Sequence, residues 1–600
     1  MRRSHSCVRA LLVLAVAIGL CGELHATPPV SVTQTADGWT YTWDGAAELQ
    51  NETHLMTNIP TPGAGADVAP IVGAGTFYAD GIDGNNSITT NVEAGHIWGT
   101  VNGHETLTHV VSYSNHATAP GAAFTVPAYD RHATWVGMMI GGRRGGAAQG
   151  QWQDGIADQT DLRSGAIATS WAAPAYALSF GATITSLDFP YSSAVSGFGT
   201  ADVINSSWGA TGTSESAGTD VRSMITDSLA NGNRFTTFVA SAGNDGDGPN
   251  TVGAPGAGYN NITVGALQND GANNYVSVAN FSSRGPQAYA DPVNGFIPHT
   301  AARRCAVDIV APGTNLTSAY YGGTTGGNDA SLAGSPNGNP GGPNWYTFSV
   351  QGTSFSAPIT AAGAALMHDA AVDKALPPDA EDTRVVKANM LNAAWKIPGW
   401  SNAQAAHPNG NGGVRTTQAL DFASGAGALD LDRTHTQYLS GQTDLPGMAG
   451  GSTSQVIGWD YAQVQIGGAT DVAITTPLLG GSEFRATLCW FRDRSYTDAQ
   501  NQIDVAFANL NLQIWDSTFT TLYSESLDTY TPVEHLTFNL PGTGKYGVRV
   551  IYPNNIFGQI DEEEYGLAWW GVEAEVGRPI PEPAALGLIG IALLVRRRRR

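Results

Sequence analysis

Short apolar stretches that alternate with helical stretches constrain the fold of this chain more than any other feature. Residues 88–92, 201–209 and 235–240 have the length and apolar character of buried strands, and residues 219–231 have a helical pattern. Strands that alternate with helices pair in parallel and carry helices on both faces of their sheet. The sequence therefore predicts an α/β, three-layer fold with a mainly parallel sheet, whose functional residues follow the carboxyl ends of the strands.

A Gly-Thr-Ser turn that leads into an alanine-rich helix is the second constraint. Gly352, Thr353 and Ser354 precede Pro358 and the apolar residues 359–367. Proline is tolerated in the first turn of a helix, so the pattern puts Ser354 at or just before a helix N-terminus. The helix dipole and free amides there favour negative charge on a nearby oxygen, which suits a serine that attacks a carbonyl. Taken alone, the block is better explained by an N-cap serine.

Length and charge bound the rest of the interpretation. A chain of 600 residues is too long to fold around a single hydrophobic core, so two or more domains are expected. Charged residues make up only 13% of the chain, glycine is abundant, and the net charge is −22. Such an acidic surface repels nucleic acid and anionic lipid, so neither is expected as a partner. Cys305 and Cys489 are the two cysteines outside the leader, and they form either one bridge between domains or two unpaired thiols.

The two ends of the chain carry sorting patterns. Residues 1–26 have the basic start, short apolar run and small-residue end of a secretory signal peptide. Residues 578–600 contain Pro581-Glu582-Pro583, an apolar run at residues 584–595 and five arginines at residues 596–600. The apolar run, roughly 18 Å long as a helix, is too short for a stable span of the membrane. This tail resembles the PEP-CTERM sorting signal. The resemblance implies an exosortase-type processing partner, only transient membrane contact, and delivery to the cell surface or extracellular matrix of a Gram-negative-type bacterium.

Seven blocks in order resemble the subtilase family of subtilisin-type serine peptidases, over about residues 88–433. They include the Ser354 block, His132 with Val136 and Gly137 behind it, the strand 202–209, and Asn244 in an Ala-Gly-Asn-Asp-Gly context. The resemblance implies the subtilisin-like fold and a secreted serine endopeptidase that cleaves protein or peptide substrates.

The family pattern gives each of these residues a role. It implies that Ser354 is the nucleophile, that His132 is the general base, and that Asn244 donates its side-chain amide to the oxyanion. His132 is also the one histidine in an apolar context suited to a positioned base. His96, His104, His109 and His116 are expected in loops or at the surface.

The acid of the triad departs from the family pattern. Subtilases usually carry Asp-[Ser/Thr]-Gly after the first core strand, and the best match here is Glu93-Ala94-Gly95. A glutamate accepts the imidazole N–H as an aspartate does. Asp80 is the competitor, but it lacks a clean apolar strand before it. We therefore predict Glu93 as the acid and leave Asp80 as the alternative.

Substrate and metal binding are expected at nearby loops. The resemblance implies that an extended peptide pairs with Ser207, Trp208 and Gly209, with the Trp208 indole narrowing the apolar subsites. The chemistry requires no cofactor. The acidic loops at residues 80–86 and 245–247 are candidates for binding a structural calcium ion, although solvated acidic turns explain them equally.

The chain divides into five predicted segments: signal peptide 1–26, N-terminal extension 27–70, peptidase domain 71–440, C-terminal domain 441–577 and sorting tail 578–600. Residues 27–69 alternate polar and aromatic residues, which indicates short β-structure, and residues 315–345 indicate a long surface loop. Period-2 strands after residue 455 predict a β-sandwich that resembles the jelly-roll domain of some subtilases. The altered acid keeps a second hypothesis open, namely a catalytically impaired subtilase fold that acts as a cell-surface or matrix binding protein.

Overall fold

The computed structural model describes residues 31–35, 38–42, 68–99, 103–115, 129–143, 154–167, 191, 201–209, 217–271, 273–293, 295–319, 321, 346–443, 451–496 and 502–574. The predicted signal peptide and sorting tail lie outside these residues, and so does His116. Among the described helices, none is both long enough and apolar enough to cross a membrane.

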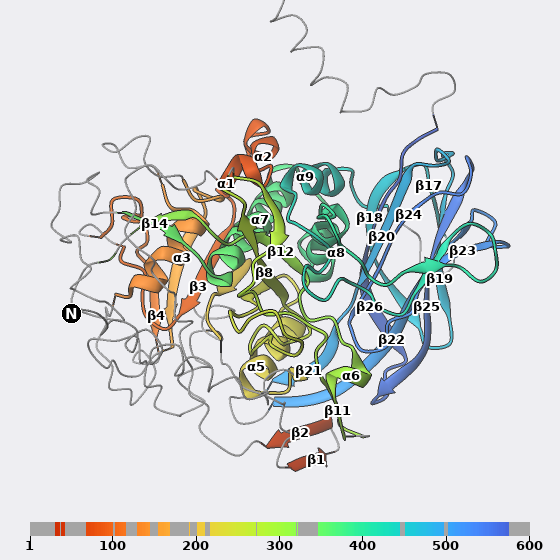
Figure 1. Ribbon diagram of the computed structural model, residues 1–600, viewed down its shortest axis with the longest axis horizontal. Coiled ribbons are helices and arrows are strands. Elements are labelled where there is room, and N and C mark those ends of the chain that lie inside the picture. The colour runs from red at the N-terminus through yellow and green to blue at the C-terminus, as the bar shows by residue number, and fades with distance from the viewer. Residues whose placement is uncertain are drawn as a thin grey trace, which may run out of the picture.

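The structure has two regions, and a mainly parallel sheet built from strands within residues 88–312 forms the centre of the first (Figure 1). Its order is β12-β8-β7-β6-β3-β5-β4, every neighbouring pair on this path is parallel, and β9 joins β8 antiparallel. The predicted α/β fold is therefore confirmed. The strands are β3 (Ile88–Glu93), β4 (Tyr113–Asn115), β5 (Asp161–Ala166), β6 (Val203–Ser206), β7 (Thr237–Ser241), β8 (Ile262–Asn269), β9 (Tyr275–Val278) and β12 (Ile309–Pro312).

Successive side chains of the central strands enter two different cores, as the period of a strand requires. Val203 and Val239 belong to a core that also contains side chains of α3 (Arg131–Gly141) and α7 (Thr353–Asp373). Ile204 and Phe238, one residue away, belong to a second core with side chains of α5 (Val221–Gly232). Helices thus cover both faces. The other helices are α1 (Val68–Ile71), α2 (Gly75–Ala79), α6 (His299–Ala302), η4 (Pro378–Glu381), α8 (Thr383–Ala393) and α9 (Leu431–Leu439).

Two small antiparallel sheets lie outside the central one. β13 (Leu316–Ala319) pairs with β14 (Tyr346–Val350), and β10 (Tyr289–Asp291) pairs with β11 (Gly295–Ile297). The predicted surface loop 315–345 therefore begins as a buried strand, because the apolar side chain of Leu316 packs into the core. Residues 322–345 of that prediction lie outside the described residues.

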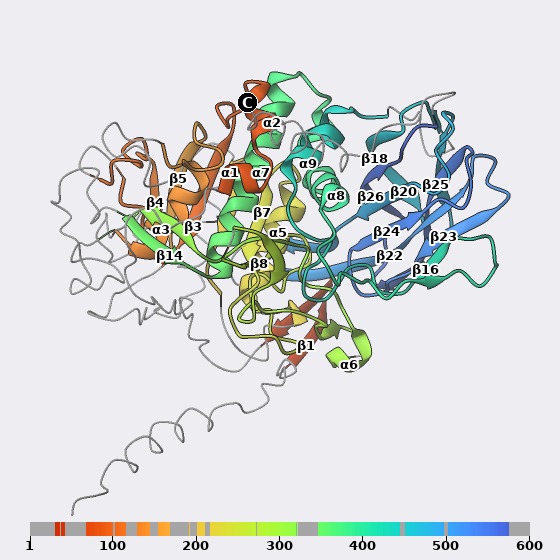
Figure 2. The ribbon, with the colours of Figure 1, turned by 45° about the horizontal axis from the view of Figure 1, so that its top comes forward.

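The C-terminal region is rich in antiparallel strands and contains two sheets that share a core (Figure 2). One sheet has the order β18-β26-β20-β24, and the other follows the path β15-β16-β23-β22-β25-β19-β17 with β1, β2 and β21 attached. Side chains of both sheets meet in one apolar cluster. The strands are β15 (Ala405–Ala406), β16 (Val414–Thr416), β17 (Gly451–Thr453), β18 (Ile457–Gln465), β19 (Ala469–Ile474), β20 (Glu483–Cys489), β21 (Arg492–Tyr496), β22 (Gln502–Asp516), β23 (Leu522–Ser526), β24 (Val533–Asn539), β25 (Tyr546–Phe557) and β26 (Glu562–Trp570).

The larger C-terminal sheet also takes strands from earlier parts of the chain. β1 (Ser31–Thr35) and β2 (Gly38–Thr42) form a hairpin that reaches β22, and β16 pairs in parallel with β23. In Figure 2, β16 and β23 lie together at the far side of the C-terminal region. Segments that precede residue 441, where the sequence predicts the C-terminal domain to begin, therefore contribute to its sheet.

Helix α8 joins the two regions, and it lies between the parallel sheet and the C-terminal strands in Figure 1. Gly566 of β26 faces the α8 backbone so closely that a Cβ atom there would stand 2.4 Å from the carbonyl carbon of Arg384. Arg494 of β21 donates to the buried Asp227 carboxylate of α5 over 2.6 Å. Cys305 and Cys489 are both buried free thiols, so the structure has no bridge between them.

Candidate active site

The predicted catalytic groups approach one another at the carboxyl edge of the parallel sheet. β3 ends at Glu93, Ser207 follows the last residue of β6, and Asn244 lies three residues after the end of β7. β3, β6 and β7 are neighbours in the sheet, so their carboxyl ends lie side by side. His132 and Ser354 come to this edge from the first turns of α3 and α7.

Glu93 and His132 form a buried pair. His132 Nδ1 donates to Glu93 Oε2 over 2.9 Å, and both side chains are fully buried. The position of the imidazole follows from the start of α3, because Asp130 caps that helix by accepting the Ala133 amide over 3.1 Å. This contact fixes the ring tautomer with a proton on Nδ1, so Nε2 is the basic nitrogen.

The second oxygen of Glu93 is also bound. Glu93 Oε1 accepts the Ser207 amide over 3.1 Å, and the Ser207 hydroxyl accepts Asn205 Nδ2 over 3.0 Å. Burial raises the pKa of Glu93, and the neighbouring His132 opposes that rise. The carboxyl group therefore depends on the imidazole and on the Ser207 amide to hold a negative charge in this place.

Ser354 is the second residue of α7, at the positive end of the helix dipole. Its Oγ donates to the Ser207 carbonyl oxygen over 2.9 Å. Gly352 precedes the helix with φ of 146°, which favours glycine, and its amide donates to the Gly313 carbonyl. The sequence predicted Pro358 in the first turn of the helix. Because α7 begins at Thr353, Pro358 lies in the second turn instead. Proline has no backbone N–H, so Pro358 donates no hydrogen bond to the carbonyl four residues before it.

Asn244 is oriented by a residue that the sequence analysis gave no role. Asn244 Oδ1 accepts both the amide of Thr353 over 2.9 Å and its hydroxyl over 3.1 Å. Fixing the carbonyl side of a planar carboxamide turns its NH₂ group to the opposite side, where it can donate. Thr353 lies directly before Ser354, and its place in the Gly-Thr-Ser turn was the available signal.

Asp80, the competing acid, lies elsewhere. It follows the end of α2, and its carboxylate accepts His435 Nε2 over 2.9 Å. The structure thus brings Glu93, and not Asp80, into hydrogen-bond contact with His132. The sequence signal that separated them was the clean strand in front of Glu93.

The Trp208 side chain, expected beside the substrate subsites, is buried in the core. The indole is only 2% exposed and packs beside Tyr191 at the second core of the sheet. A large aromatic ring after a central strand is stabilised by burial in the core, and the narrowing of substrate subsites by Trp208 stays a prediction. Ser207 is fully buried and half-buried Gly209 is the most accessible of the three predicted substrate-binding residues.

Two histidines that were expected at the surface are buried. His96 and His104 have no exposed surface, since aromatic rings of Tyr113 and Tyr346 pack edge-on against them. Burial lowers the pKa of His96 to about 3, and it lowers that of the half-buried His109 to about 4. The imidazoles of His96 and His109 are therefore neutral near pH 7.

The loop at residues 80–86 does not fit a calcium ion. Backbone amides of Asp83, Gly84 and Asn86 point to the carboxylate of Asp369, at 2.8–3.2 Å. A loop that turns N–H groups inward offers the wrong polarity to a cation, which needs oxygen ligands. Among the described residues, neither this loop nor residues 245–247 belongs to a group of side chains close enough together to share a metal ion.

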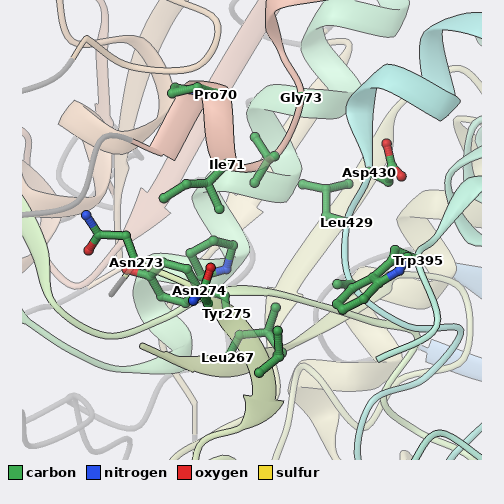
Figure 3. A pocket seen from close by; sticks show the side chains of 14 residues that line it. Pro70, Ile71, Gly73, Leu267, Asn273, Asn274, Tyr275, Trp395, Leu429 and Asp430 are labelled. Atoms are coloured by element: carbon green, nitrogen blue, oxygen red, sulfur yellow. The ribbon is translucent and has the colours of Figure 1, made fainter. Parts of the chain in front are cut away.

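A cavity of about 340 Å³ lies near the ends of β8 and β12 (Figure 3). Trp395 and Leu429 line one side, and Asn273 and Tyr275 line the other. None of the predicted catalytic residues is among the lining side chains, so the cavity is separate from the Glu93–His132 pair.

The sequence profile of the Subtilase family matches residues 88–427, more than half of the chain. The chain belongs to the subtilase family. All of the residues placed at the carboxyl edge lie within the matched part of this subtilase.

Two curated relatives are similar to parts of this subtilase. Subtilisin of Bacillus sp. (strain TA39) is 34% identical over 122 residues, which are 20% of this chain and 26% of the relative. Serine protease AprX of Bacillus subtilis (strain 168) is 30% identical over 188 residues, or 26% of this chain and 34% of the relative. The chain therefore spans about a quarter to a third of the length of these relatives.

Proposed function

We propose that this subtilase is a serine endopeptidase that hydrolyses protein or peptide substrates with Ser354, His132, Glu93 and Asn244. The observation that carries the proposal is the buried Glu93–His132 hydrogen bond of 2.9 Å beside the first turn of α7. Membership of the subtilase family and the similarity to two named proteases support it.

The proposed reaction begins with a rotation of the Ser354 hydroxyl. In the structure Oγ donates to the Ser207 carbonyl, so the side chain must turn from that oxygen toward His132 Nε2 before attack. His132 takes the Oγ proton as a C–O bond forms to the scissile carbonyl, and Glu93 stabilises the imidazolium. The imidazolium then gives its proton to the leaving amine. A water molecule, activated by the same imidazole, releases the acyl group and restores Ser354.

Asn244 supplies the proposed oxyanion donor. Since Thr353 holds its carbonyl oxygen, the NH₂ group is oriented before substrate arrives, and a donor in place costs no reorganisation during the reaction. Loss of one such donor lowers kcat by about 10²–10³-fold, a magnitude taken from subtilisin itself.

The extended substrate would pair with the backbone at residues 207–209. Export by residues 1–26, exosortase processing at residues 578–600, and a jelly-roll character of the C-terminal region belong to the same proposal. They rest on the sequence patterns alone, and on the two antiparallel-rich sheets for the last.

Covalent labelling with a fluorophosphonate probe tests the nucleophile directly. We expect the purified mature protein to be labelled once, Ser354→Ala not to be labelled, and Asp80→Asn to be labelled at the wild-type rate. Asp80→Asn is the matched control, because it removes the competing carboxylate without touching the Glu93–His132 pair. Casein cleavage should follow the labelling.

Two outcomes would contradict the proposal. Labelling that survives in Ser354→Ala would assign the nucleophile elsewhere. A folded wild-type protein without labelling or cleavage would favour the competing role, a binding protein of the cell surface or matrix.

A further inference from the structure

A second group of polar side chains lies at the opposite, amino edge of the parallel sheet. Asp202 directly precedes β6, His368 lies in the second half of α7, and Glu381 ends η4. One ligand atom from each residue lies within 4.8 Å of the others. Along α7, fourteen residues or about 21 Å separate His368 from Ser354, so this group is remote from the active site.

We propose that Asp202, His368 and Glu381 bind a divalent transition-metal ion, with Zn²⁺ as the best-matched ion. The proposal is independent of the peptidase function, because none of the three residues takes part in that chemistry.

The orientation of His368 is the first argument. The residue is fully buried, and its Nε2 lies 3.3 Å from the Thr237 hydroxyl. A proton on Nε2 directed to that hydroxyl leaves the lone pair on Nδ1. Among the described residues, no hydrogen-bond partner reaches Nδ1, and the nearest carboxylate oxygen, Oε1 of Glu381, lies 3.7 Å away. A neutral imidazole whose far nitrogen is held by an oxygen is the usual state of a metal-binding histidine.

The two carboxylates are the second argument. Asp202 and Glu381 are both half-buried, so an ion from solvent can reach them. Asp202 Oδ2 accepts the Ile88 amide over 2.7 Å, which fixes its direction. Burial raises the pKa of Asp202, with Glu381 adding to the rise and His368 opposing it. Two carboxylates this close repel each other, and a cation between them would remove that repulsion.

Among the described residues, the cation with a recorded effect on this group is already held by another carboxylate. Arg163 is the guanidinium with an electrostatic effect on Asp202, and it binds one oxygen of Asp161 through Nε at 3.1 Å and through an Nη at 2.7 Å. One imidazole and two carboxylates are a ligand set for Zn²⁺ with water at a fourth position, and calcium prefers an all-oxygen site.

Calorimetric titration of the metal-free mature protein with ZnCl₂ tests the proposal. We expect one saturable site in the wild type, and at least a 100-fold weaker Kd in Glu381→Gln. This variant should fold, because the replaced side chain is half-buried and keeps its length. Thr237→Val keeps the shape of its side chain but removes the oxygen that holds Nε2, and it should weaken binding about 10- to 100-fold.

His407→Gln is the matched control. His407 is also buried beside a glutamate, with Nε2 3.2 Å from Oε1 of Glu525, but it lacks the second carboxylate of the proposed site. Its Kd for Zn²⁺ should equal that of the wild type. A melting temperature that rises with Zn²⁺ in the wild type and not in Glu381→Gln would support the same conclusion without any use of peptidase activity.

Three results would overturn the proposal. The wild type could bind no Zn²⁺, which would leave Asp202, His368 and Glu381 as a cluster without a metal ion. Glu381→Gln and Thr237→Val could both bind as the wild type does, which would place the ion elsewhere. Ca²⁺ could bind more tightly than Zn²⁺, which would contradict the assignment of a transition metal.

Discussion

The active site and the interface between the two regions both bury ionisable side chains, but with different chemistry. At the active site an imidazole meets a carboxylate, through His132 and Glu93. At the interface guanidinium groups meet carboxylates: Arg494 binds Asp227, and Arg492 binds Asp504. All of these side chains are fully buried.

The difference lies in the protons. A guanidinium keeps its proton at every ordinary pH, so the interface network can hold two regions together but cannot transfer a proton. An imidazole exchanges its proton near neutral pH, so the Glu93–His132 pair can change its charge during a reaction. Buried charged groups therefore hold the two regions together at the interface, whereas at the active site they allow a proton to be transferred. Substitutions that separate activity from stability test this comparison.

The largest expected effect is that of Glu93→Gln on turnover. The amide keeps the length of the side chain but loses its charge and can impose the wrong tautomer on His132, so kcat should fall about 10⁴-fold. Stability at pH 7 should not fall, because a buried carboxyl with a raised pKa is removed. Peptide cleavage and urea unfolding measure the two quantities.

Glu93→Asp is the matched control for that change. It keeps the charge but loses one methylene, so it cannot reach both the His132 ring and the Ser207 amide. We expect it to retain more activity than Glu93→Gln. Full activity in Glu93→Gln would remove the glutamate from the mechanism.

Arg494→Leu should have the next largest effect, and on stability alone. Removing one partner leaves the Asp227 charge buried, which costs about 3–5 kcal/mol of unfolding free energy. The kcat of the folded fraction should be unchanged. Arg549→Leu is the control: it breaks the Arg549–Asp471 pair, whose side chains are 22% exposed, and should cost at most about 1 kcal/mol. Equal losses in both variants would contradict the role given to the buried network.

Gly566→Ala should destabilise the interface by about 1–3 kcal/mol, because the new methyl group would press on the α8 backbone at Arg384. Gly542→Ala has no atom within 4 Å of its added carbon and serves as the control. Thermal unfolding compares the two. A neutral Gly566→Ala would show that β26 and α8 separate easily.

The smallest effect is a pH dependence at the interface. Burial raises the pKa of Glu563 well above its usual range, and Asp493 adds to that rise. Burial also raises the pKa of Asp493 to about 6. Above about pH 4.5, these two carboxyl groups keep their protons in the folded state but lose them in the unfolded chain. The free energy of unfolding therefore falls as pH rises above about 4.5.

Glu563→Gln should remove part of this fall in stability at high pH. The variant should be more stable than the wild type by at least about 1 kcal/mol at pH 8, with no difference near pH 4. The exposed neighbour provides the control variant Glu562→Gln, which should show no such pH dependence. Urea unfolding at several pH values measures it, and a stability gain that persists at pH 4 would contradict the explanation.

Local patterns in the sequence predicted the parallel sheet and the approach of Glu93 and His132, because strand ends and helix starts are local features. The roles of Thr353 and of the Ser207 amide were missed, since they depend on hydrogen bonds between segments more than 100 residues apart. The burial of His96, His104 and Trp208 was missed for the same reason: polar or amphipathic side chains become buried when distant segments pack over them.

The exchange of strands between the two regions has a practical consequence for anyone who wishes to excise the catalytic half. A polypeptide that stops near residue 440 would retain β16 but lose β23, its parallel neighbour. The unpaired backbone donors and acceptors on that short strand would be available to other chains. Recombinant fragments of this length should self-associate, whereas the intact polypeptide should remain dispersed.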